Sequence, residues 1–310
     1  MTDLILHHYP FSSFSEKVRT ALGFKGLAYQ SVEIAGLPPR PLLTPLTGGY
    51  RRAPVLQVGA DIYCDTQIIL PALDRLHPGT SLYPAGSEGV AEGLGFAWER
   101  QMWLPTIGVL VHFIGEHIPP DFLKDRKEGY LMVDISKDAM APQFEAHVQF
   151  VRGQLAWLAQ ALQARPFLFG SVPSAADLAC WQTLFLLRQN CPPEVDALLG
   201  LTAGSPVLPW YDRIAAFGHG RPSPMTAEQA FEVARAAQPA PVTHLPANGD
   251  PGGLQAGCPV TVTPDDNARV PVSGTLVAAS AQELVIHRKD AQAGDLHLHF
   301  PRAGFDVRAA

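Results

Sequence analysis

Residues 9–22 read Tyr-Pro-Phe-Ser-Ser-Phe-Ser-Glu-Lys-Val-Arg-Thr-Ala-Leu and follow a short strand-like run. Apolar side chains recur within them at helical spacing, at Phe14, Val18, Ala21 and Leu22. This periodicity predicts a helix with one buried face. Three serines, Ser12, Ser13 and Ser15, lie at the start of this helix, where backbone N–H groups are unpaired and carry a partial positive charge. The stretch therefore predicts a site for a thiolate or a carboxylate near the start of the chain.

The surrounding residues, 1–80, predict a mixed α/β domain. We expect strands at 4–9, 29–34, 54–58 and 62–64, and helices at 13–23 and from Thr66 to a stop at Pro78. The first two strands are joined by a helix, which requires parallel pairing, whereas the last two are joined by a short turn and form a hairpin. This order, β-α-β followed by β-β-α, is that of a thioredoxin-like sheet. The proline-rich passage 36–50 between the halves reads as irregular.

Two proline- and glycine-rich linkers, 78–87 and 238–253, separate the remainder into two further parts. Residues 88–237 show helical periods throughout and predict an all-helical domain with one long helix around Pro105. Residues 254–310 alternate between apolar and polar side chains and predict a small all-β module, in the form of a twisted barrel of four or five strands.

Composition limits the classes of function. The chain has 310 residues and a net charge of −6, which argues against nucleic acid as a partner because phosphate binding needs clustered Lys and Arg. Four cysteines without a C-x-x-C pair suit free thiols in a reducing compartment. We see no signal peptide and no apolar run long enough for a membrane span. We therefore expect a cytoplasmic protein without a membrane partner.

The serines of the first stretch allow a structural and a functional interpretation. Ser13-x-x-Glu16 has the form of a capping box, so we expect Ser13 to be the N-cap. Ser12 then lies one residue outside the helix, with its hydroxyl free to face a ligand. Helix capping alone is the structural alternative for the cluster.

Two other segments have side chains or backbone suited to a ligand. Pro54 opens a strand, and a cis bond before it would turn the N–H and C=O of Ala53 toward the helix start, where an extended peptide can pair with them. From spacing alone an ordinary trans proline is favoured. Asp65 and Thr66 can each cap the next helix, but an acidic side chain beside a helix start also suits the ammonium and carboxylate of an α-amino acid. The pair fits a γ-glutamyl group.

These segments together resemble the glutathione S-transferase family. Residues 9–19 are similar to the active-site segment of its zeta and omega classes, and Ala53-Pro-Val-Leu56 is similar to its loop with a cis proline. Asp65-Thr66 resembles its γ-glutamyl-binding pair, and residues 169–177 resemble a capping box of its helical domain. The resemblance covers about residues 1–225 and leaves 254–310 without a counterpart.

The resemblance implies roles for individual residues. Ser12 stands at the catalytic position, and its hydroxyl would stabilise the thiolate of glutathione, the co-substrate. Ala53 and Pro54 would bind the cysteinyl backbone, and Asp65 and Thr66 the γ-glutamyl end. Arg52 stands where the family places a residue near the glycine carboxylate, with Arg51 as the other candidate. Ser13 departs from the family, in which many members have proline.

The expected activity is that of a glutathione transferase acting on a small apolar electrophile. Two alternatives remain open: a glutathione-dependent isomerase of zeta type, and a non-catalytic binding or scaffold protein that keeps the fold. The family also implies a homodimer formed through the helical domain.

The histidines of the β-module suggest a metal. His287, His297 and His299 would suit zinc if they shared a sheet face. No carboxylate or thiol pattern accompanies them, so we favour an ordinary polar sheet face and expect no metal. Asp265-Asp-Asn267 reads as a hairpin turn with too few ligands for calcium.

Overall fold

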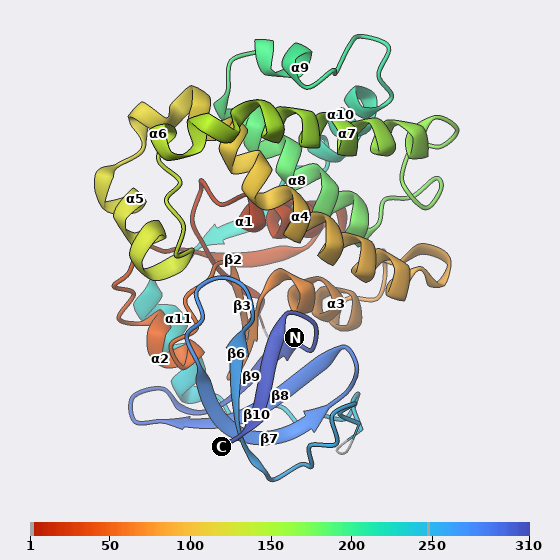
Figure 1. Ribbon diagram of the computed structural model, residues 1–310. Coiled ribbons are helices and arrows are strands. Elements are labelled where there is room, and N and C mark those ends of the chain that lie inside the picture. The colour runs from red at the N-terminus through yellow and green to blue at the C-terminus, as the bar shows by residue number, and fades with distance from the viewer. Residues whose placement is uncertain (1–2, 247–248) are drawn as a thin grey trace. The chain divides into compact units, whose positions relative to one another are not determined.

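The computed structural model describes residues 3–246 and 249–310 and divides into two compact units (Figure 1). The first unit comprises the chain through Val18, Leu27–Leu76 and Arg221–Ala310. The second comprises Arg19–Gly26 and His77–Gly220. The helix that follows the first strand contributes residues to both units.

The N-terminal part of the first unit has the predicted thioredoxin-like order. Its elements are β1 (Ile5–His8), α1 (Ser13–Phe24), β2 (Ala28–Glu33), α2 (Leu43–Thr47), β3 (Val55–Val58), β4 (Asp61–Cys64) and α3 (Thr66–Leu76). Strand β1 pairs parallel with β2 and antiparallel with β3, and β3 forms a hairpin with β4. The passage predicted as irregular contains the short helix α2, which ends at Gly48 in the left-handed region (φ 64°).

The C-terminal strands continue this same sheet. They are β6 (Pro259–Pro264), β7 (Val272–Ala279), β8 (Glu283–Asp290), β9 (Gly294–Pro301) and β10 (Phe305–Ala309). Strand β9 pairs parallel with β4, with Ile62 opposite Leu298, and a strand that we did not predict, β5 (Arg221–Pro224), pairs with β2. The result is one ten-stranded sheet in the order β10-β6-β7-β8-β9-β4-β3-β1-β2-β5. We expected a module that stands apart as a barrel; within the described residues the ladder instead runs on from β4 and does not close.

One hydrophobic core lies beneath both parts of this sheet. Buried side chains of α2, β3 and β4 share it with those of β6 to β10 and of α11 (Ala227–Ala236). Tyr50, just after α2, lies with its ring centroid 5.9 Å from Phe300 and 6.3 Å from Phe305. Because Phe305 belongs to the outermost strand, the sheet curls far enough to bring β10 against the segment that follows α2.

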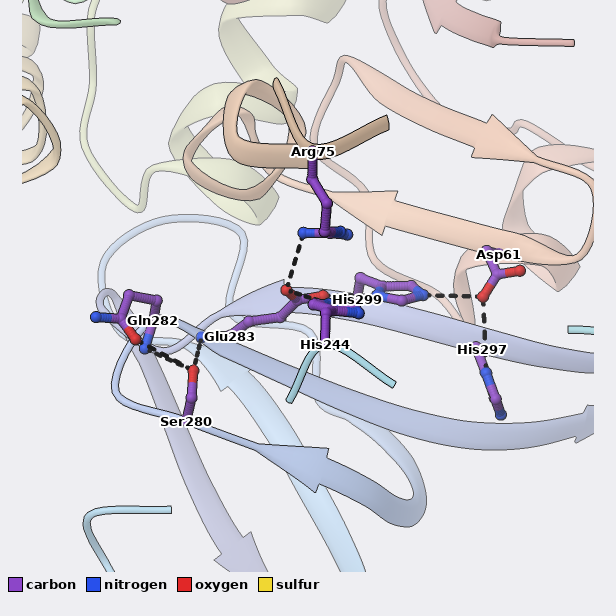
Figure 2. Close-up of polar contacts among 8 residues, drawn as sticks. All are labelled: Asp61, Arg75, His244, Ser280, Gln282, Glu283, His297 and His299. Carbon is purple, nitrogen blue, oxygen red and sulfur yellow. Dashed lines mark hydrogen bonds and ion pairs between the residues drawn. The ribbon is translucent and has the colours of Figure 1, made fainter. Parts of the chain in front are cut away.

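A buried network of charged side chains joins β4 to β9 and β8 (Figure 2). His299 is 2% exposed, and its two ring nitrogens lie 3.0 Å from Asp61 Oδ1 and 2.7 Å from Glu283 Oε1. Glu283 also contacts His244 at 3.0 Å and Arg75 at 3.5 Å. We expected His299 to lie on an ordinary polar face of the sheet. This prediction is wrong, because the His299 ring is buried between the carboxylates of Asp61 and Glu283.

The charges of this network support one another. Burial would lower the pKa of His299, but the hydrogen bonds to Asp61 and Glu283 outweigh burial and raise it. Burial would likewise raise the pKa of Glu283, but its contacts with His244 and His299 hold it at about 2. The pKa of Asp61 is held below its ordinary value in the same way. Both ring nitrogens of His299 thus face carboxylate oxygens, an arrangement that favours the protonated ring.

The second unit is helical, as predicted. Its long helices are α4 (Glu88–Ile114), α7 (Phe144–Leu162) and α8 (Ala175–Asn190), and α4 contacts both others. Shorter helices complete it: α5 (Pro120–Asp125), α6 (Lys137–Met140), α9 (Glu194–Leu198) and α10 (Val207–Ala215), with a π-helical turn at Arg126–Tyr130. Ser174 and Asp177 form the predicted capping box at the start of α8. No helix among the described residues is both long and apolar enough to cross a membrane.

Candidate functional site

The predicted site residues meet at one edge of the sheet because of strand register. His7 near the end of β1 pairs with Val55 at the start of β3, and Val55 pairs with Cys64 at the end of β4. These strand ends lie side by side, and the segments that follow β1, precede β3 and follow β4 contain the predicted residues: Ser12, Arg52, Ala53, Pro54, Asp65 and Thr66. The register therefore brings together three segments that are separate in the sequence.

Ser12, and not Ser13, caps the first helix. Helix α1 begins at Ser13, and the Oγ of Ser12 accepts a hydrogen bond from the N–H of Ser15 at 3.1 Å. The prediction that Ser13 is the N-cap is wrong by one residue, because the Tyr9 carbonyl accepts the Ser12 N–H and closes the turn there. A hydroxyl that accepts through a lone pair still has its O–H to donate. Within residues 3–246 and 249–310, that O–H has no acceptor.

The Ala53–Pro54 bond is cis, which is the form that the resemblance implies and not the one that spacing alone favours. Pro54 is buried, and Ala53 is half-buried in the bend just before β3. The N–H and C=O of Ala53 make no hydrogen bond to another described residue. An extended peptide is the kind of ligand that pairs with such a backbone pair.

Asp65 is held in a backbone conformation that is unusual for its type. Its φ is 98°, and a non-glycine residue in a sparsely populated region costs about 1–3 kcal/mol. Three contacts hold it: Oδ1 accepts the N–H of Gln67 at 3.0 Å, Oδ2 accepts the hydroxyl of Tyr50 at 3.3 Å, and Oδ2 lies 3.6 Å from Arg52 Nη1. Asp65 thus caps α3, and Thr66, its buried first residue, follows.

Arg52 forms hydrogen bonds with the loop between β6 and β7, a contact that we did not predict. Its Nη2 donates to Asp266 Oδ1 and to the carbonyl of Asn267, both in the loop between β6 and β7. Its guanidinium also lies 5.9 Å from the centre of the Phe305 ring. These contacts join residues more than 200 positions apart, so no local pattern of spacing indicates them. The turn at Asp265-Asp-Asn267 is therefore part of the surroundings of the site.

Two cysteines of this chain, Cys64 and Cys191, do not supply a reactive thiol. Cys64, next to Asp65, is fully buried, and burial raises its pKa well above the ordinary value. Burial raises the pKa of Cys191 to about 12. Because only the thiolate is nucleophilic, both groups are unreactive near neutral pH. Among the residues that the structure describes, no three His, Cys, Asp or Glu are arranged to hold a metal ion.

Comparisons with known proteins find two family models that match parts of this chain and a similar structure that matches all of it. The chain matches the family model "Glutathione S-transferase, N-terminal domain" over residues 6–81 and "Glutathione S-transferase, C-terminal domain" over residues 141–213. It is 35% identical to a GST-like protein from Pseudomonas syringae, with a TM-score of 0.76 and complete coverage of both chains. A search of curated proteins gives no match.

More distant structures share the fold over part of the chain. A glutathione S-transferase of Ceriporiopsis subvermispora, in complex with glutathione, is 17% identical with a TM-score of 0.57 and covers 69% of this chain and 96% of its own. One from Rhodospirillum rubrum F11 is 21% identical with a TM-score of 0.50 and covers 69% and 88%. Residues 214–310 lie outside both family models, whereas the Pseudomonas syringae protein is matched along its whole length.

Proposed function

This chain belongs to the glutathione S-transferase family, and we propose that it binds glutathione as its co-substrate and activates the thiol for attack on a small apolar electrophile. The observation that carries the proposal is the O–H of Ser12, which has no described acceptor and sits at the N-terminus of α1. The assignment of this serine segment to the zeta or omega class stays a prediction.

Ser12 and its helix have enough stabilising free energy for the task. Lowering a thiol pKa from about 8.5 to about 6.5 requires roughly 2.7 kcal/mol of preference for the thiolate. A hydrogen bond to a charged acceptor contributes about 1.5–3 kcal/mol, and a helix N-terminus about 0.3–1 kcal/mol. The Ser12 hydroxyl acts as a donor and keeps its proton. The thiol proton passes to water, and the sulfur then forms a bond to the electrophilic carbon. In a substitution, the leaving group departs with the electron pair of its bond to that carbon; in an addition to an activated double bond, the π electrons move to the neighbouring atom, which takes a proton from water.

The rest of the tripeptide would follow the same sheet edge. The N–H and C=O of Ala53, beside the cis Pro54, would pair with the cysteinyl backbone, as strand addition does elsewhere. The Asp65 carboxylate would bind the γ-glutamyl ammonium, and the N-terminus of α3 at Thr66 would bind the γ-glutamyl carboxylate. The position of Arg52 suits the glycine carboxylate, with Arg51 as the other candidate.

An apolar electrophile is supported by the residue before Ser12. Phe11 is 84% exposed, the largest exposed fraction among the large apolar side chains described. An aromatic ring left in water beside a nucleophile can cover an apolar substrate at little cost. Conjugation rates measured with a panel of small apolar electrophiles would identify the substrate class.

The cytoplasm and a homodimer complete the proposal. All four cysteines are free thiols, which suits a reducing compartment. On α4, Val90 and Leu94 are exposed one helical turn apart, which suits an apolar contact between copies through the helical unit. Sedimentation at equilibrium tests the dimer, and loss of association in Val90→Asp would support this surface.

The decisive experiment measures the bound thiol. Glutathione is titrated with pH in the presence of excess protein, and the thiolate is followed by its ultraviolet absorbance. We expect a pKa well below that of free glutathione, restored toward the free value in Ser12→Ala. Ser13→Ala is the matched control, because Ser13 neighbours the cap without being it, and should leave the pKa unchanged.

Other outcomes separate the alternatives. Absence of glutathione binding at millimolar concentration would contradict the proposal and favour a non-catalytic binding protein. Binding with a lowered thiol pKa, but with glutathione recovered unchanged after turnover, would identify an isomerase in place of a transferase.

A further inference from the structure

The loop between β6 and β7, residues 265–271, lies against the candidate glutathione site. Arg52 Nη2 carries two N–H groups, and Asp266 Oδ1 and the Asn267 carbonyl each accept from it. The other terminal nitrogen, Nη1, faces Asp65 at 3.6 Å. Both terminal nitrogens of the guanidinium are therefore directed at acceptors within the chain.

This loop is fixed in place by its neighbours. The N–H of Asp265 donates to the Gly304 carbonyl at 3.0 Å, which ties the loop to the turn before β10. Where the loop joins β7, a Cβ added to Gly48 would lie 2.8 Å from Val272 Cγ1. The C-terminal strands are thus in close contact with the segment between α2 and β3, and Asp266 is positioned by the fold.

The two carboxylates that contact Arg52 oppose a further anion there. One guanidinium faces two carboxylates, Asp65 and Asp266, so the three groups together carry a net negative charge. A ligand carboxylate that approached Arg52 would have to displace Asp266 or meet this negative charge. Arg52 has 15% of its side chain exposed, so solvent screens the competition only in part.

We propose that Asp266 is a specificity-determining residue of this site: it occupies Arg52 from within the chain and thereby removes most of the affinity that the glycine carboxylate of the ligand would gain there. The inference rests on the proposed function. If Asp266 occupies Arg52, a γ-glutamyl-cysteinyl peptide with a neutral glycine end, such as an amide or an ester, loses little affinity relative to glutathione. The site would then accept a broader class of ligands than glutathione itself.

The experiment compares two ligands, glutathione and its glycyl monoethyl ester, by isothermal titration calorimetry. In the natural protein we expect the two dissociation constants to agree within about threefold. In Asp266→Ala we expect glutathione to bind about tenfold more tightly than the ester, the lower end for a hydrogen bond between charged groups because Arg52 is partly exposed. Asp266→Asn, which keeps a neutral acceptor, should give an intermediate ratio.

Two further variants identify the cause. Asp306→Asn removes one negative charge from the same group of strands, at an exposed pair with Arg308, and should leave the ratio as in the natural protein. Combining Arg52→Gln with Asp266→Ala removes the guanidinium that Asp266 released, so the ratio should return to about one. Thermal unfolding of each variant checks that the fold is kept.

The possible failures are distinct. If the natural protein binds neither ligand, the proposed function fails, and this inference with it. If it binds both but Asp266→Ala leaves the ratio of the two dissociation constants unchanged, the inference alone is overturned. A loss of affinity for both ligands in Asp266→Ala would also overturn it, because Asp266 would then support Arg52 in binding and not compete with the ligand.

Discussion

Replacing His299 by leucine should destabilise the first unit far more than an ordinary histidine substitution. Leucine fills a similar volume but donates no hydrogen bond, so Asp61 and Glu283 would lose the cation between them. Each would keep some partners: the Ala240 N–H donates to Asp61 at 2.9 Å, and His244 and Arg75 contact Glu283. The buried carboxylates would therefore be weakened and not stripped of every partner.

The magnitude follows from burial. Removing one member of a buried ion pair costs about 3–5 kcal/mol, because the other member is left as an uncompensated charge. His287 provides the matched control: it lies on neighbouring β8 and contacts Asp295 at 3.0 Å, but 38% of its side chain is exposed. Exposed pairs contribute about 0–1 kcal/mol. We expect His287→Leu to cost no more than that.

The assay must report on the correct unit. The five tryptophans lie between residues 98 and 210, within the helical unit, so their fluorescence does not follow the network. Amide hydrogen exchange of peptides from β4 and β9 reports on the network directly, because Asp61 and His299 lie in these strands. We expect exchange there to quicken strongly in His299→Leu and little in His287→Leu. Equal exchange in the two variants would refute the argument that burial sets the cost.

The pH dependence of the free energy of unfolding provides a second test of the role of His299. The folded pKa of His299 is raised, so its contribution is complete below the unfolded value of about 6.5 and is lost as pH rises through the folded pKa. The pKa values of Asp61 and Glu283 are lowered, so their contributions are complete above about 4.5 and fade as pH falls. The contribution of this network to stability should therefore be greatest between about pH 4.5 and 6.5, and His299→Leu should abolish its alkaline decline.

Two further substitutions test other parts of the structure. Asp177 accepts hydrogen bonds from Leu168 N–H at 2.9 Å and Trp210 Nε1 at 2.9 Å, so Asp177→Ala leaves buried donors unpaired and should cost about 3 kcal/mol or more, measured by urea unfolding with tryptophan fluorescence. Gly48→Ala combines a positive φ with the close approach of β7 and should lower the thermal midpoint more than Gly26→Ala, where φ is similar but nothing lies within 4 Å. Equal midpoints would contradict the close approach.

Local pattern was enough to predict the thioredoxin-like half of the fold, whereas the site residues at its sheet edge were assigned with the help of the family resemblance. The helical stripe after Ser13, the hairpin before Thr66 and the capping box at Ser174 each depend on neighbours within a few positions. The same reasoning failed by one residue at the cap of α1, because both Ser12 and Ser13 have the chemistry of an N-cap and only the turn closed by Tyr9 decides between them.

The features that sequence reasoning missed depend on contacts between distant parts of the chain. Nothing in residues 254–310 reveals that β9 will pair with β4, because either edge of a strand offers the same backbone groups. The burial of His299 depends on Asp61, 238 positions away. The contact of Asp266 with Arg52 spans 214 positions. Such pairings become visible only when the order of strands in the sheet is known.

The pairing of β4 with β9 also bears on how the chain is made. Ribosomes add about 5–20 residues each second, so on the order of 10–50 s separate the synthesis of Asp61 from that of His299. During this interval β4 has an open edge, and so does β2, whose neighbour β5 is also made late. Open strand edges recruit other chains. A chain that stops before β9 would leave the edge of β4 unpaired, and we expect it to aggregate more readily than the 310-residue chain.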